Sequence, residues 1–169
     1  MPIMDAFLPE FDREMVIVRK HLERVPDGKF DFKPHPKSMA LGRLASHLAE
    51  LPSWAISALQ LDSLDLAPPG GPPFKPAVLD TQAAVLALFD KNVAGARAEM
   101  AVVADEKLMQ NWSLLMGGQT MMTMPRVALL RTWVLNHAIH HRAQLGVYLR
   151  LNDVPVPSTY GPSADEGKM

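Results

Sequence analysis

Apolar residues recur at spacings of three and four in four segments of this chain, and no other feature constrains its fold as strongly. The segments cover about residues 7–25, 38–61, 80–103 and 125–151. Side chains at these spacings share one face of an α-helix, so each segment predicts a helix with one buried stripe. With 169 residues, of which 48% are hydrophobic, the chain suits a single domain with one core.

The connections between the four segments complete the predicted architecture. APPGGPPFKP, residues 67–76, cannot form a helix or a central strand, so it is expected to be a long crossover between the second and third helices. Residues 112–124 contain two short runs around Gly117-Gly118, which predicts a small β-hairpin before the fourth helix. The predicted fold is all-α: a four-helix bundle over residues 1–151, followed by an extended or disordered tail over residues 152–169.

Two residues predict details of the second helix. Ser38 precedes its first apolar residue and is expected to cap its N-terminus. Pro52 lies inside the segment and has no backbone N–H, so it is expected to kink the helix or to mark a break.

Cysteine usage and charge exclude several classes of protein. The chain has no cysteine, which excludes disulfides, a thiol nucleophile and a thiolate metal site. Its formal charge is −1 and its basic residues are scattered, so no nucleic-acid partner is expected. No signal peptide and no apolar run of membrane-spanning length are recognisable. The expectation is therefore a soluble, cytoplasmic protein without a membrane or nucleic-acid partner.

Two histidines of the fourth segment share the apolar arc that is expected to face the core. At 3.6 residues per turn, His137 and His141 fall within the arc defined by residues such as Val134 and Leu145, whereas His140 lies on its flank. Histidines at positions i and i+4 stack on one face of a helix, where both can bind one ion. His140 is expected at a rim or against a partner.

A third histidine completes a candidate metal site. His47 shares the inward stripe of the second helix, so three imidazoles from two helices would describe an open site with further positions for water or substrate. The zinc-protease HExxH pattern is excluded, because Ala138 replaces its glutamate. The simpler interpretation, histidines packed in a core without a metal, stays open.

Other titratable residues are expected to be solvated. His21 and His35 have no histidine partner at a ligand spacing. Glu14 and Glu50 are candidates to contact a ligating imidazole from outside, but each is more typical of a solvated helix charge. Neither a catalytic base nor a substrate contact can be recognised.

At these residues the sequence resembles the DinB family. The resemblance spans nearly the whole chain and rests on SMALGRLASHLAELPSWA in the second helix and LNHAIHHRAQLGVYL in the last. The HxxxHRxQ pattern, which runs from His137 to Gln144, is the more specific motif, and the ending VPVPSTYGPSADE resembles one subgroup. The resemblance implies a homodimeric four-helix bundle that binds a divalent ion, zinc or nickel, through His47, His137 and His141.

The resemblance also suggests a chemistry. Similar proteins include thiol-dependent transferases and isomerases, which implies a low-molecular-weight thiol and a small-molecule substrate. Neutral imidazoles would leave the full charge on the ion, which would acidify a bound thiol or water. The first hypothesis is therefore a metal-dependent S-transferase or hydrolase. The alternatives are a non-catalytic protein whose ion is structural or senses metal or stress, and a helical interaction module without a metal.

The last helix carries a second face, opposite the histidines. It consists of small and apolar residues, among them Leu135, Ile139, Ala143 and Gly146. Such a face indicates either a central position in the domain or a contact between subunits.

Overall fold

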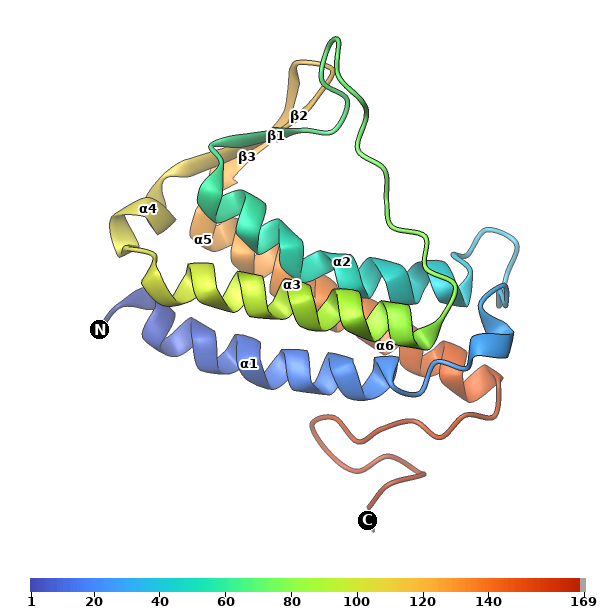
Figure 1. Ribbon diagram of the computed structural model, residues 1–169. Coiled ribbons are helices and arrows are strands. Elements are labelled where there is room, and N and C mark those ends of the chain that lie inside the picture. The colour runs from blue at the N-terminus through green and yellow to red at the C-terminus, as the bar shows by residue number, and fades with distance from the viewer. Residues whose placement is uncertain (168–169) are drawn as a thin grey trace.

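The computed structural model describes residues 1–167, which are mostly helical with a small three-stranded sheet (Figure 1). The helices are α1 (Ile3–Leu22), α2 (Leu41–Gln60), α3 (Gln82–Val102), α4 (Asp105–Met109), α5 (Arg126–Leu129) and α6 (His137–Leu151), with a 3₁₀ turn η1 (Asp27–Lys29) and a π-helix η2 (Leu130–Asn136). The strands are β1 (Ser63–Asp65), β2 (Asn111–Met116) and β3 (Gln119–Pro125). Residues 168 and 169 of the predicted tail lie outside the described residues.

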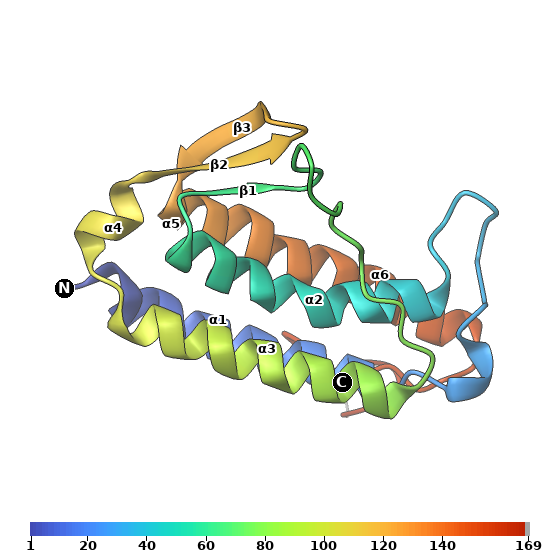
Figure 2. The same ribbon diagram turned by 45° about the horizontal axis from the view of Figure 1, so that its top comes forward.

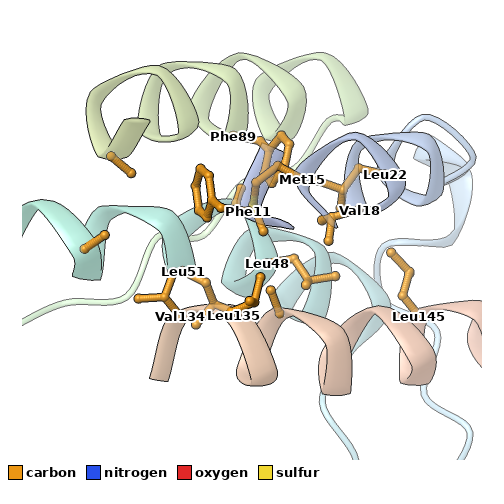
Figure 3. Packing of buried hydrophobic residues seen from close by; sticks show 14 of the residues in the cluster. Phe11, Met15, Val18, Leu22, Leu48, Leu51, Phe89, Val134, Leu135 and Leu145 are labelled. Atoms are coloured by element: carbon orange, nitrogen blue, oxygen red, sulfur yellow. The ribbon is translucent and has the colours of Figure 1, made fainter. Parts of the chain in front are cut away.

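The long helices pack side by side in two layers. Figure 2 shows α1 beside α3 in one layer and α2 beside the continuous α5–η2–α6 segment in the other. The α1 helix contacts α3 and α6, and α2 contacts α3 and α6. Their apolar stripes meet in one core, where Phe11, Leu48 and Val134 come from three different segments (Figure 3). Within residues 1–167, no helix is both long enough and apolar enough to cross a bilayer.

The small sheet lies over α2 and α5, on one of the two helical layers (Figure 2). The predicted hairpin is present as the antiparallel pair β2–β3, and Gly117 and Gly118 both have positive φ in its turn. The third strand, β1, was not predicted and pairs in parallel with β2. Asp65 in β1 accepts hydrogen bonds from the backbone N–H groups of Gly117 (3.0 Å) and Gly118 (2.7 Å), which fixes the turn to this strand. Three residues are too few for a recognisable period, so the sequence shows no sign of β1.

The predicted cap of α2 is wrong. The helix begins at Leu41, and the N-cap residue Ala40 offers no side-chain acceptor. Backbone carbonyls of the preceding loop take this role: Leu41 N–H donates to Phe32 O, and Gly42 N–H donates to Phe30 O, both at 2.9 Å. Because the loop lies this close, a Cβ at position 42 would be only 2.3 Å from the Phe30 ring, so glycine is required there.

The predicted break at Pro52 is also absent, because α2 continues through this residue to Gln60. A proline inside a helix costs about 3 kcal/mol, whereas burying a leucine side chain contributes roughly 1.5–3 kcal/mol. Leu48, Leu51 and Ala55 are all almost fully buried around the proline. Their combined burial outweighs the lost hydrogen bond.

The C-terminal tail follows α6 as residues 152–167 without helix or strand. It returns along α1 and α6 (Figure 1). Arg24 binds Glu166, Arg150 binds Asp165, and Tyr160 donates to Glu14 at 2.8 Å. The tail thereby makes specific polar contacts with both helices.

Candidate metal centre

Three imidazoles converge between α2 and α6. His47 projects from the N-terminal half of α2, and His137 and His141 project from the first two turns of α6. Nε2 of His137 lies 2.9 Å from Nε2 of His141 and 3.4 Å from Nε2 of His47. One ring nitrogen from each histidine lies within 4.8 Å of the other two, and this is the spacing of three ligands around one ion.

Neighbouring groups hold the outward sides of these rings. The Nδ1 atom of His141 is 2.7 Å from Oε1 of Gln144, one helical turn further along α6. The ring of His137 is hydrogen-bonded to the backbone of Trp133. Bonds of this kind orient an imidazole and select its tautomer, so that the opposite Nε2 lone pair faces the cluster.

Glu50 lies behind the third histidine. Its Oε2 atom is 3.8 Å from Nδ1 of His47 and accepts a hydrogen bond from Arg43 at 3.0 Å, while its Oε1 atom accepts from the backbone N–H of Ala77. Burial opposes ionisation, but the nearby His47 ring and the hydrogen bonds from Ala77 and Arg43 outweigh it, and the pKa of Glu50 is lowered. The expected solvated charge is instead a buried carboxylate that lies between His47 and the backbone of Ala77.

Two histidines of the cluster, His137 and His141, favour the neutral form. Burial lowers the pKa of His137, and the neighbouring His47 lowers it further. Burial also lowers the pKa of His141 to about 4, although the hydrogen bond with Gln144 acts to raise it. A neutral imidazole is the form that ligates metal, so both residues could bind an ion at neutral pH without first losing a proton.

Acidification is predicted to destabilise the metal-free protein through His141. The unfolded imidazole binds a proton near pH 6.5, whereas the folded one stays neutral down to about pH 4. Because the unfolded state binds more protons in this window, the free energy of unfolding falls as the pH falls. Between pH 7 and pH 5, His141 alone accounts for a loss of about 2 kcal/mol.

Urea denaturation of chelator-treated protein at pH 7 and pH 5 measures this loss. His141→Gln keeps a polar side chain but removes the titrating ring, so its loss should be smaller by that amount. Equal losses in the wild type and the variant would contradict the assignment. His21, whose pKa is also lowered, lies apart from the cluster and contributes equally to both proteins.

A cavity of about 340 Å³ gives access to the cluster. It is lined by Thr132, Trp133, Asn136, His137 and His140. Trp133 lies against the His137 ring at a centroid distance of 6.4 Å and against Trp54 at 5.9 Å. Trp133 therefore gives the cavity an aromatic wall, and Thr132, Asn136 and His140 add polar groups.

The segment that presents these residues is not a regular α-helix. The predicted last helix begins after Pro125 and ends at Leu151, as expected, but Leu130–Asn136 form a π-helix immediately before His137. Its wider turn carries Trp133 and Asn136 beside the first histidine. The irregularity was not predicted, since π-helices depend on tertiary packing and often occur at functional sites.

The structure separates the remaining candidates from the cluster. His140 is exposed on the cavity rim, and His35 is exposed, both as expected. The expectation that His21 and Glu14 are solvated is wrong, since both are 2% exposed. His21 donates a hydrogen bond from Nδ1 to Ile17 O at 2.9 Å, and Glu14 pairs with Arg142, which explains how each is accommodated in the interior.

Comparison with known proteins places this geometry in a family. The model of the DinB family matches residues 3–168. A crystal structure of a DinB-like protein from Bacillus cereus ATCC 10987 is similar with a TM-score of 0.69 and 24% identity, covering 92% of this chain and 97% of that one. A DinB-like protein from Bacillus subtilis gives a TM-score of 0.67 and 17% identity, covering 91% and 97%. Both show the same fold. No curated protein matches.

Proposed function

The chain belongs to the DinB family, and on that premise we propose that it is a metal-dependent enzyme that transfers a thiol to, or hydrolyses, a small molecule. The three-histidine cluster is the observation that carries the proposal. The family resemblance favours zinc or nickel, and both ions accept nitrogen ligands.

The donor set fits an ion of this kind. His47, His137 and His141 would hold it through Nε2, and the bonds to Gln144 and Trp133 keep two of the rings aimed inward. A divalent ion in this position supplies a Lewis acid that lowers the pKa of a thiol or water bound beside the substrate. Three protein ligands leave further positions open, which is the pattern of catalytic rather than structural zinc.

The cavity beside His137 would bind the substrate. The aromatic wall of Trp133 would pack against its apolar part, and the exposed amide of Asn136 would offer a donor and an acceptor. Because the cavity is small, the proposal limits the substrate to a small molecule. The thiol would enter from the same side.

A non-catalytic role is the alternative, in which the ion only stabilises the fold or reports on metal or stress. It requires a closed coordination shell. Within residues 1–167, the cluster contains three ligating side chains, and Glu50 is directed to the outer side of His47. This arrangement favours the enzyme.

Three further expectations accompany the proposal and stay predictions. They are a homodimer, a cytoplasmic location, and the four-helix bundle as the description of the two helical layers. The packing of α1 and α2 each against both α3 and α6 supports the last of these.

Metal analysis followed by two assays tests the function. The untagged, full-length protein should contain about one divalent ion per chain by mass spectrometry. The loaded protein should then either couple glutathione to 1-chloro-2,4-dinitrobenzene or hydrolyse 4-nitrophenyl acetate faster than the free ion does. An ion without either reaction supports the non-catalytic alternative, and no ion after incubation with zinc or nickel overturns both.

A further inference from the structure

A second cavity lies on the opposite side of α6 from the histidine cluster. Its volume is about 550 Å³, within the range of small-molecule sites. One wall is the outer face of α6, and the other is the C-terminal tail. This α6 face is the small, apolar face recognised in the sequence, and it is not fully covered: Ile139 and Gly146 are half-buried and Ala143 is exposed.

A buried histidine forms part of this cavity. His21, on α1, is 2% exposed and lines it next to Gly146. Its Nδ1 atom is bonded to the carbonyl of Ile17, so Nδ1 carries the proton and Nε2 is left as an acceptor. Within residues 1–167, Nε2 has no hydrogen-bond partner, and a Cβ at Gly146 would lie 3.8 Å from it.

The charges around the cavity are already compensated. Arg142 binds Glu14 and the hydroxyl of Tyr160, and Arg150 binds Asp165. Burial, together with the charges of Arg142 and Arg24, lowers the pKa of His21 despite opposing contributions from the Ile17 carbonyl and Glu166. The site therefore presents a neutral acceptor, without a free charge to attract an ionic ligand.

The remaining walls are mainly apolar. They are contributed by Ile139, Val147, Leu151, Val156, Pro157 and Pro162. A ligand that fills the cavity must satisfy Nε2 of His21 with a donor and cover these side chains with apolar surface.

We propose that this cavity binds an uncharged, apolar molecule that carries one hydroxyl group, which donates its hydrogen bond to Nε2 of His21. Gly146 keeps the path to this atom open, since a side chain at that position would grow between His21 and Val156. The site is separate from the metal centre, and ligand binding there does not require an ion.

A matched pair of probes tests the hydroxyl. 4-Fluorophenol and 4-fluoroanisole share the fluorinated ring and the oxygen attached to it and differ by one methyl group, but only the phenol can donate a hydrogen bond. In ¹⁹F NMR titrations of the full-length, zinc-loaded protein at pH 7, the phenol should bind saturably and roughly fivefold more tightly than the anisole. Equal affinity of the two probes, or no saturable binding of either, would overturn the proposal.

Four variants locate the binding. Gly146→Leu fills the cavity and should abolish binding of both probes, whereas Ala87→Leu adds the same side chain to an exposed position of α3 and should change nothing. His21→Phe keeps an aromatic side chain but removes the acceptor, so both probes should bind equally. His137→Ala should bind the phenol as the wild type does, which excludes the metal centre.

The outcome for Gly146→Leu decides between a ligand and a second copy of the chain. Light scattering on the same samples reports the oligomeric state. Unchanged probe binding in Gly146→Leu, or an absence of probe binding together with a dimer that this substitution dissociates, would show that the cavity is not the proposed ligand site.

Discussion

Replacing His141 with alanine is expected to remove the bound ion from the protein. His141 is the most buried of the three histidines and the most strongly biased toward the neutral, ligating form, with a pKa of about 4. Structural zinc sites with four ligands bind with about 10–16 kcal/mol, so one ligand contributes on the order of 3 kcal/mol. The expected loss of affinity is therefore on the order of a hundredfold.

Competition titrations with a chromophoric chelator measure this affinity directly. His140→Ala is the matched control, because His140 neighbours His141 on α6 but is exposed and lies outside the cluster. It should bind the ion as the wild type does. If His140→Ala lost the ion and His141→Ala kept it, the assignment of ligands would be wrong.

The shared face of His137 and His141 could be predicted from the sequence because α6 is a regular α-helix at these two residues. From His137 to Leu151 the helix has 3.6 residues per turn, so the i, i+4 relation of His137 and His141 holds in space. The inward position of His47 could be predicted in the same way, because this residue shares the apolar stripe of α2. Metal binding itself stays a prediction, since spacing shows where nitrogen atoms lie and not what they bind.

Other features depend on contacts between residues far apart in the chain. The π-helix before His137 and the backbone caps of α2 arise from tertiary packing, which local patterns do not encode. The Thr81 cap of α3, by contrast, is a local bond to Ala84, and the predicted start of that helix is confirmed. Glu14 was expected to be solvated because its partner is 128 positions away.

Arg142→Met, which removes the partner of Glu14, should lower the free energy of unfolding by about 3–5 kcal/mol. Arg142 and Glu14 are both almost fully buried and form an ion pair at 2.5 Å. Removing the guanidinium leaves a carboxylate in the interior without its counter-ion. Its desolvation is then uncompensated, and Tyr160 loses a donor as well.

Urea denaturation of the metal-free protein measures the change, and two variants separate its causes. Arg150→Met removes an arginine of the same helix whose ion pair with Asp165 is largely exposed, so it should cost below about 1 kcal/mol. Glu14→Leu/Arg142→Met removes both buried charges and should recover most of the stability, because an apolar replacement of a buried pair is often neutral. Equal losses for the single and double variants would mean that packing of the arginine stem, and not the unpaired carboxylate, causes the destabilisation.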